Sequence, residues 1–528
     1  MIKRNASARA IDLGLAALAF GTSFAVYLRT LAPTIAFLFD DSLEFQLLAQ
    51  RAAIAHPTGY PLYSLLLVLA ARLIPPGDVA YRANLLSALF AACAVALMYL
   101  AARRLPFGNP LSALLAALIF AFGESFWSQA IIAEVYAFQA FLTAAILWVA
   151  LALASTTQPI ARSRMFTGLC FLVGLSIAHH RMSALNIPAL ALYVLLQDKT
   201  IWHRQNLRAL IRPLSAFLTP LLLFTYLPLR GITSGSLDGT YQNTLAGFLD
   251  WVTGASYTIF LTQNPFNEQR DPAFYFSLFT NELTWLGVGL VLLGLGVLLT
   301  ARRARRAGVL LVVGLVANFL FAVNYRVADI DVFMIPTFLY GSLILAVGIG
   351  AILYPLTAIT QASDANRRKW LSGLAVVVIL LGGAIPYFLI RSNWQAVRLD
   401  DKYDVYDYGR AALTTLTQDA TIIGILGEMT RVRYLQETSG LAPNVETIAA
   451  DKEEARLSAA ENAVKRNRAV FLTRKLSNVE KVFSLSSAGP LVRVRGRDVP
   501  PQRPASISHV LNENFDGATL LGYDLDAS

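Results

Sequence analysis

Long apolar runs separated by short polar segments fill most of the first 390 positions of the chain. A helix that crosses a membrane needs about 20 mostly apolar residues. Eight runs clearly meet this requirement: 11–31, 82–101, 136–154, 211–229, 283–300, 308–324, 333–355 and 371–390. Three shorter runs, 111–123, 166–179 and 183–196, can be partial helices that line a cavity within the membrane. The pattern predicts an all-α polytopic membrane bundle of about eleven spans. A shorter apolar stretch at 60–73, in the long first outer loop, is expected to form a re-entrant or interfacial helix.

The rest of the chain alternates short strand-like and helix-like segments. Strands are expected at 420–426, 444–449 and 469–472, and helices at 430–438 and 452–465. This alternation is typical of a small α/β domain. A last apolar segment, 518–525, looks like an opening strand with nothing after it to pair with. We therefore divide the chain into a membrane domain (1–391), an α/β domain (392–505) and a terminal segment (506–528), which either begins a truncated further domain or docks elsewhere.

Composition and charge support a membrane protein. Hydrophobic residues make up 56% of the chain and charged residues 15%, whereas soluble domains are about 25% charged. Residues 1–391 contain 27 lysines and arginines, of which 18 fall in the N-terminal segment and five short loops: 1–10, 102–110, 155–165, 197–212, 301–307 and 356–370. The positive-inside rule places these segments in the cytoplasm, together with the N-terminus, and places residues 391–528 outside. Basic stripes with interleaved aromatics are absent, so no nucleic-acid partner is expected.

The loop after the first span holds the best candidates for chemistry. Asp41 and Glu44 stand three residues apart, so they share one face of a helix. Such a pair can deprotonate an acceptor hydroxyl. The same spacing also fits a helix start capped by Asp40 or Asp41, with Glu44 completing a capping box. His56 precedes a proline, and a hydrogen-bonded turn residue is the alternative to a ligand-binding histidine there.

Several motifs of this chain occur together in one known family. They are Asp41-Ser-x-Glu-Phe, His56-Pro-x-Gly-Tyr-Pro-Leu-Tyr, Arg82–Ser87, Phe126–Ala130, Ala133–Ala137, Tyr226–Arg230 and Asp329–Pro336. Together they resemble bacterial membrane proteins related to the animal transmembrane O-mannosyltransferase that acts on plexin-type domains, and more distantly the GT-C superfamily of glycosyltransferases. The resemblance covers about residues 25–525. The family usually has glycine at the positions of Asp40 and Leu43, so Asp41 carries the family acid and Asp40 is an additional one.

The resemblance implies an activity. It implies transfer of a sugar, with mannose favoured, from a polyprenyl phosphate to a hydroxyl outside the bacterial inner membrane, with inversion. The acceptor is a protein serine or threonine, or an envelope glycan or lipid. Asp41 is the implied base, and Glu44 orients it or binds a hydroxyl. The implied partners are the lipid-linked donor, the acceptor and membrane lipids. Cofactors are not expected. A divalent metal held by Asp41, Glu44 and Asp331 is conceivable, but the metal-dependent WWDYG signature is absent and no metal is expected.

The same resemblance assigns further residues on the outer side of the membrane. The expected donor phosphate or lipid ligands are His56, Tyr60, His180 and Arg230. The expected sugar or acceptor ligands are Asp40, Glu134, Tyr136, Asp329 and Asp331. Structural alternatives stay open: an interfacial arginine at 230, a satisfied buried histidine at 180, a solvated acid at 134, and an ion pair of the two aspartates with Arg326.

Two other functions are compatible with the sequence. A transporter or flippase of a lipid-linked or small polar substrate would also need polar residues at membrane depth, but it typically has inverted repeats, which the chain lacks. A non-catalytic envelope scaffold would leave Asp41, Glu44 and His56 tolerant of mutation.

Overall fold

The computed structural model describes residues 6–197, 208–354, 365–497, 507–515 and 518–523. Internal contacts divide the chain into a membrane unit, Met1–Tyr406, and an α/β unit, Asp407–Ser528. The boundary expected at 391/392 falls inside helix α18 (Ala365–Val397). The unit boundary therefore lies beyond this helix, and the terminal segment belongs to the α/β unit.

In the described residues, eight helices are long and apolar enough to cross a membrane. Six are single helices: α1 (Ala6–Thr30), α4 (Val79–Ala102), α7 (Val135–Leu153), α8 (Pro159–His179), α14 (Pro272–Thr300) and α17 (Ile335–Leu353). The other two are Arg302–Asn324, which is mainly α15 (Arg305–Asn324), and Arg208–Thr233, which joins α10 (Ile211–Leu218), η4 (Thr219–Thr225) and α11 (Tyr226–Thr233). A bent pair, α5 (Pro110–Phe122) and α6 (Glu124–Ala130), can form a ninth span. The chain is thus a polytopic membrane protein.

The described residues contain eight or nine of the roughly eleven expected spans, and local features account for the shorter runs. Run 183–196 forms η1 (Arg181–Asn186) and the 11-residue α9 (Ile187–Gln197), which is too short. Run 111–123 is one arm of the pair that bends by 70° next to Gly123. A Cβ on Gly123 would lie 1.9 Å from Oε2 of Glu282, so the buried carboxylate fits only against glycine. Run 371–390 lies in α18, whose side chains are described only in part.

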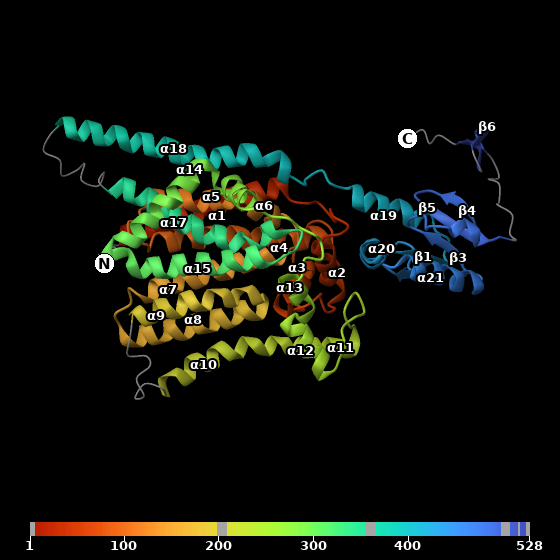
Figure 1. Ribbon diagram of the computed structural model, residues 1–528, viewed down its shortest axis with the longest axis horizontal. Helices are drawn as coiled ribbons and strands as arrows, with labels where there is room; N and C mark the ends of the chain where they lie inside the picture. Colours follow the sequence, from red (N-terminus) through yellow and green to blue (C-terminus); the bar gives the residue numbers. More distant parts are fainter. Residues whose placement is uncertain (1–5, 198–207, 355–364, 498–506, 516–517, 524–528) are drawn as a thin grey trace. The chain divides into compact units, whose positions relative to one another are not determined.

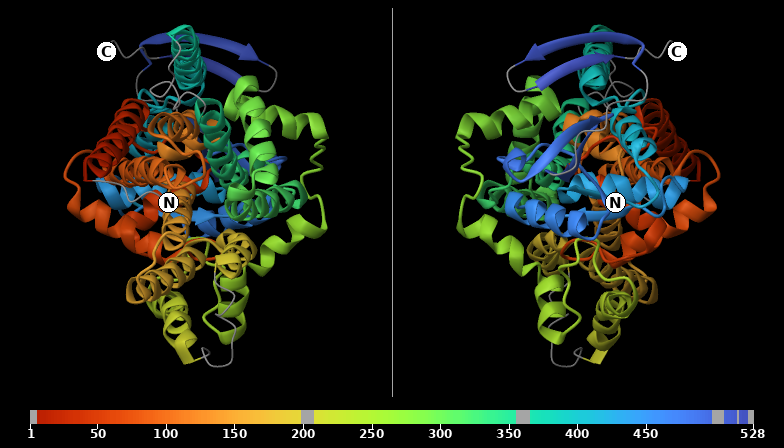
Figure 2. Two further views of the ribbon diagram at one scale, coloured as in Figure 1. Left: turned by 90° about the vertical axis from the view of Figure 1, so that its left-hand side faces the viewer. Right: turned by 90° about the vertical axis from the view of Figure 1, so that its right-hand side faces the viewer.

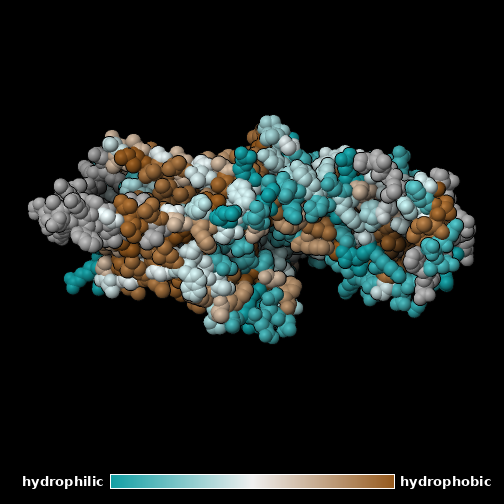
Figure 3. All heavy atoms as spheres, turned by 90° about the horizontal axis from the view of Figure 1, so that it is seen from above, coloured by the Kyte–Doolittle hydropathy of each residue, from teal (hydrophilic) through white to brown (hydrophobic). Residues whose placement is uncertain are grey.

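The helices of the membrane unit run side by side (Figure 1). Helices α7 and α17 are mostly buried, whereas α8 and α14 expose much of their apolar surface. Figure 2 looks along the bundle and shows α8, α9 and α10, in orange to yellow, grouped at one edge. Broad hydrophobic areas cover the helical part in Figure 3. Such areas suit contact with lipid.

The two ends of the bundle differ in charge. At one end, Arg103 bonds to Asp12 (Nε–Oδ1 2.6 Å), and Arg303 lies over the ring of Phe107 at 3.7 Å. The loops at the opposite end hold the acids assigned to the site. This separation agrees with the charge pattern that predicted the orientation, which stays a prediction.

The α/β unit contains a five-stranded sheet of order β2-β1-β3-β5-β4. Its strands are β1 (Ala420–Gly424), β2 (Glu446–Ala449), β3 (Ala469–Leu472), β4 (Phe483–Ala488) and β5 (Leu491–Gly496). Strands β1, β2 and β3 are parallel, and β4 and β5 pair antiparallel. Helices α20 (Leu426–Ser439) and α21 (Glu453–Lys465) connect the parallel strands. The α/β expectation is therefore confirmed.

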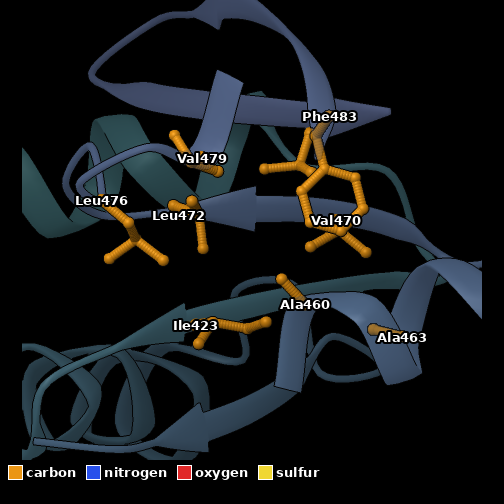
Figure 4. Close-up of a cluster of buried hydrophobic side chains, with 9 residues drawn as sticks. Ile423, Ala460, Ala463, Val470, Leu472, Leu476, Val479 and Phe483 are labelled. Atoms are coloured by element: carbon orange, nitrogen blue, oxygen red, sulfur yellow. The ribbon is translucent and has the colours of Figure 1, made fainter. Parts of the chain in front are cut away.

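Successive side chains of a strand point to opposite faces of the sheet, and those on one face form the core of this unit. Val470 and Leu472 of β3 point to the face covered by Ala460 and Ala463 of α21 (Figure 4). Helix α19 (Asp404–Thr415) precedes the sheet. Segment 518–525, which was expected to have nothing after it to pair with, pairs instead with the strand before it: β7 (Ala518–Tyr523) is antiparallel to β6 (His509–Phe515), a strand that the sequence pattern did not reveal.

Candidate functional site

Helix α2 (Asp41–Arg51) carries Asp41 and Glu44 in its first turn. Asp40 is its N-cap, and its Oδ1 accepts a hydrogen bond from the backbone N of Ser42 at 2.8 Å. A side-chain oxygen at this position satisfies a free helix N–H, and a carboxylate also suits the helix dipole. The capping role therefore falls to Asp40. Glu44 does not close a capping box, because its Oε1 accepts from the backbone N of His56 at 2.9 Å.

His56 lies between the two family acids. Its Nδ1 contacts the carboxylate of Glu44, and its Nε2 lies 3.5 Å from Oδ2 of Asp41. Burial disfavours a charged imidazole, but the charges of Asp41 and Glu44 outweigh this cost and raise the pKa of His56 to about 9. An imidazolium thus lies between two carboxylates at neutral pH. The Asp41 side chain is 63% exposed and free to meet a ligand.

A tight loop holds His56 in this position. Gly59 has φ +84°, and a Cβ there would lie 2.4 Å from Cδ2 of Leu227 on α11. Only glycine combines this backbone conformation with so close a neighbour. Tyr60 follows as the N-cap of α3 (Pro61–Leu73), the short apolar helix expected in the first outer loop. Its ring centroid lies 5.1 Å from that of His56 and 5.8 Å from that of His180.

A cavity of about 550 Å³ opens at this end of the bundle. Nine of the eleven residues assigned from the sequence line it: Asp40, Asp41, His56, Tyr60, Glu134, Tyr136, His180, Asp329 and Asp331. They come from five separate parts of the chain, so the fold gathers them into one place. Glu44 lies behind His56, and Arg230 lies outside the lining.

Glu134 is not a solvated loop acid. It is the N-cap of α7, where its Oε2 accepts from the backbone N of Val135 at 3.2 Å, and it is only 4% exposed. Glu134 and Asp40 both line the cavity. Burial, with added repulsion from Asp40 and Asp41, raises the pKa of Glu134 well above its ordinary value.

His180 is buried but not satisfied. It is 5% exposed, and its Nδ1 has no hydrogen-bond partner among the described residues. Burial and the nearby charges of His179, Arg181 and His56 lower the pKa of His180 well below its ordinary value. The imidazole is therefore neutral and offers its ring nitrogens to a ligand rather than a positive charge.

The cavity has one arginine in its lining, Arg181, which the sequence reasoning did not assign. Its Nη1 donates to the backbone carbonyls of Thr253 (2.6 Å) and Gly254 (3.0 Å), and its guanidinium lies 5.5 Å from the ring centre of Tyr257. The sequence feature that could have pointed to Arg181 is its position directly after His180. Arg230, by contrast, donates to Oγ of Ser234 at 2.6 Å.

Aromatic rings form another part of the cavity lining. Phe260 stacks on Phe266 at 5.8 Å and meets Tyr325 at the same distance, and Tyr325 lies 4.9 Å from Phe333. Asp329 precedes the short helix α16 (Ile330–Phe333), which carries Asp331. Among the described residues, neither aspartate forms an ion pair with Arg326. These acids are thus open to a ligand in the cavity.

Asp41, Glu44 and His56 also satisfy the simple geometry of a cation site, since one ligand atom of each lies within 4.8 Å of the others. A metal-binding histidine must be neutral. His56 is instead protonated and engaged by carboxylates through both ring nitrogens. The arrangement as it stands fits an ion-pair network, and we derive no step through a metal.

The sequence of this chain is similar to one known family of transferases. Residues 41–203 match the family model of the N-terminal domain of the protein O-mannosyl-transferase TMEM260. The mouse protein O-mannosyl-transferase TMEM260 is 28% identical over 422 residues, which cover 77% of this chain and 59% of the mouse protein. The chain thus spans less than two thirds of that relative's length.

Two solved structures share the fold. ArnT from Cupriavidus metallidurans bound to undecaprenyl phosphate superposes with a TM-score of 0.63 at 14% identity, covering 93% of this chain and 99% of ArnT. The oligosaccharyltransferase of Archaeoglobus fulgidus, in complex with zinc and sulfate, gives a TM-score of 0.53 at 12% identity, covering 88% and 68%. This chain thus shares its fold with these two proteins, and its sequence is similar to the TMEM260 protein O-mannosyl-transferases.

Proposed function

We propose that this protein is a membrane glycosyltransferase that moves a sugar, mannose in the first instance, from a polyprenyl phosphate to a hydroxyl of an acceptor outside a bacterial inner membrane. One observation carries the proposal. A single cavity at one end of the membrane helices holds Asp41, His56 and Arg181 together. The kinship with TMEM260 and the fold shared with ArnT, whose structure contains undecaprenyl phosphate, support the same chemistry.

Asp41 is the proposed catalytic base. Its exposed carboxylate accepts the proton of the acceptor hydroxyl as the oxygen attacks the anomeric carbon. The bond from that carbon to the phosphate oxygen breaks on the opposite side, and the polyprenyl phosphate leaves with the bonding electrons. The configuration at the anomeric carbon is therefore inverted. The His56 imidazolium, anchored by Glu44, orients Asp41.

Arg181 is the proposed ligand of the donor phosphate, in the role that the sequence suggested for Arg230. A guanidinium can bind phosphate oxygens through two parallel hydrogen bonds and offset the charge that grows on the leaving group. Tyr60 and His180 lie beside it and can hydrogen-bond the phosphate. Asp40, Glu134, Tyr136, Asp329 and Asp331 are the proposed ligands of sugar and acceptor hydroxyls. The acceptor class, a protein side chain or an envelope glycan or lipid, is left to experiment.

The test is sugar transfer by the purified full-length protein in lipid nanodiscs. Labelled polyprenyl phosphate sugars are supplied one at a time, with envelope extract as acceptor. Asp41→Asn keeps the size of the side chain and removes the base, and we expect a loss of about 10²-fold or more. The matched control is Asp250→Asn on α12 (Leu245–Thr253), an exposed aspartate outside the cavity, which we expect to transfer like wild type. A chelator in the assay is expected to leave transfer unchanged.

Two outcomes would contradict the proposal. Full transfer by Asp41→Asn would move the base to another acid of the cavity. Absence of transfer with every donor, from protein shown to be folded, would refute the enzyme and favour a flippase, which movement of lipid-linked sugar across liposomes would then measure.

A further inference from the structure

Another cavity, of about 420 Å³, lies between α8, α9 and α10. These helices stand together at one edge of the bundle (Figure 2). The side chains that line the cavity are all hydrophobic, and none of them lines the candidate site. Two of them, Leu214 and Ile187, are 57% and 39% exposed, so the cavity is a groove that opens to the outside of the bundle. At membrane depth such a groove faces lipid.

The groove is closed toward the candidate site. A Cβ on Gly174 of α8 would lie 2.0 Å from the backbone carbonyl oxygen of Phe217 on α10, so the two helices are in backbone contact there. The neighbouring Val173 and Phe217 line the groove at this contact. From there the groove extends toward the N-terminal ends of α8 and α10, where Phe166 and Leu210 line it. It therefore leads away from the site proposed for the donor phosphate.

The far end of the groove is basic. Arginines lie at or next to the N-terminal ends of α8, α10 and α15: Arg162, Arg164, Arg208, Arg212 and Arg306. Arg162 precedes Phe166 by four residues, so it lies one turn below the lining residues on the same face of α8. Arg306 donates to Oε1 of Gln197, the last residue of α9, at 2.9 Å. The described segments 159–197, 208–233 and 301–324 contain no aspartate or glutamate.

We propose that the groove binds one chain of an anionic phospholipid, whose headgroup phosphate contacts the arginines at this end. The hydrophobic lining suits an apolar chain and offers no polar partner to any other ligand. The arginines then select the headgroup, since basic pockets between membrane helices at the cytoplasmic side bind anionic lipids. The predicted orientation places this end in the cytoplasmic leaflet, which carries such lipids. The site lies outside the proposed sugar transfer and does not depend on it.

The location is tested by photo-crosslinking of the full-length protein in nanodiscs. They contain phosphatidylcholine and a small fraction of phosphatidylglycerol with a photoactivatable group on one chain. Mass spectrometry is expected to find the label on α8, α9 and α10. Ala191→Phe adds a ring at an exposed lining position of α9, fills the groove and should remove most of this label. The matched control is Leu222→Phe, at an exposed position of η4 outside the lining, which should be labelled like wild type.

The headgroup is tested by Arg164→Gln combined with Arg208→Gln. One arginine near a lipid surface changes the binding of anionic lipid about fivefold, so the preference for labelled phosphatidylglycerol over labelled phosphatidylcholine should fall about tenfold or more. Arg29→Gln combined with Arg72→Gln, at exposed positions of α1 and α3 near the opposite end of the bundle, is the matched control and should keep the preference.

Three results would overturn the inference. Labelling that survives Ala191→Phe would exclude the groove, and equal labelling of wild type by the two phospholipids would exclude selection of an anionic headgroup. Displacement of the label by unlabelled polyprenyl phosphate, but not by the same amount of unlabelled phosphatidylglycerol, would assign the groove to the donor instead. No arm of the experiment needs sugar transfer, so failure of the proposed function and failure of the lipid site are distinguished.

Discussion

Replacement of His56 by glutamine removes the only positive charge between Asp41 and Glu44 that the structure describes. Glutamine retains hydrogen-bonding groups and similar bulk, but it cannot be protonated. The two carboxylates would then lie close together without a cation. We expect the variant to fold and to lose stability in a way that depends on pH.

The size of the effect follows from the pKa of His56, which rises from 6.5 to about 9. Each pKa unit corresponds to about 1.4 kcal/mol of preference for the proton in the folded state, so the bound proton contributes about 3 kcal/mol. The side chain is only 18% exposed, so water screens little of this contribution. Because the pKa is raised in the folded state, the contribution is complete below pH 6.5 and is lost as the pH rises through 9.

The measurement is the free energy of unfolding of wild type and His56→Gln in one detergent, followed by tryptophan fluorescence from pH 6 to pH 9.5. The difference between the two proteins should shrink by about 3 kcal/mol over this range. His509→Gln on β6, in the other unit, is the matched control and should give a constant difference. A difference that is independent of pH, or that grows toward pH 9.5, would refute the assignment of the charged imidazole.

Three further changes test other parts of the structure. Arg181→Lys keeps a positive charge but loses the fork that binds two carbonyls, and we expect kcat/KM to fall about tenfold, mainly through the KM for the lipid donor in a donor titration. Gly59→Ala forces a Cβ against Leu227 at positive φ and should cost about 1–3 kcal/mol of stability, measured by denaturation; a second change, Leu227→Ala, should recover part of the loss. Glu428→Gln breaks the ion pair with Arg474 and the bond to Thr473 in the α/β unit, so it should lower unfolding stability by about 1–3 kcal/mol at pH 7. Because these bonds lower the pKa of Glu428, this last loss should fade as the solution is acidified.

Hydrophobic pattern predicted most of the fold because span length is a local property. Runs of about 20 apolar residues became α4, α7 and α17, and the strand–helix alternation after residue 419 became the α/β unit. The close packing of Gly123 at the bend could not be predicted, because its neighbour there is Glu282, 159 positions further along the chain. Strand β6 was missed for a similar reason, since it is defined by its pairing with β7.

In the site, too, the sequence revealed residues that lie close together along the chain but not the contacts between distant ones. Asp41, Glu44 and His56 were found together because α2 and the following loop place them within 16 positions of one another. The role of Arg181 depends on carbonyls 72 and 73 positions away, which no local pattern reveals. The raised pKa of Glu134 depends on its burial and on the nearby charges of Asp40 and Asp41, and the folded chain brings these about.

The charges of the cavity explain how an acid-rich site can accept an anionic donor. Five carboxyl groups line it, but the charge of Asp41 lies beside the His56 imidazolium, and burial raises the pKa of Glu134 well above its ordinary value. Arg181 forms no ion pair among the described residues, since its partners are two carbonyls and an aromatic ring. A phosphate that reaches Arg181 therefore does not have to displace a carboxylate. In the proposed function the acids bind neutral hydroxyls and the guanidinium of Arg181 binds the charged leaving group, which is the distribution that transfer from a lipid phosphate to a hydroxyl requires.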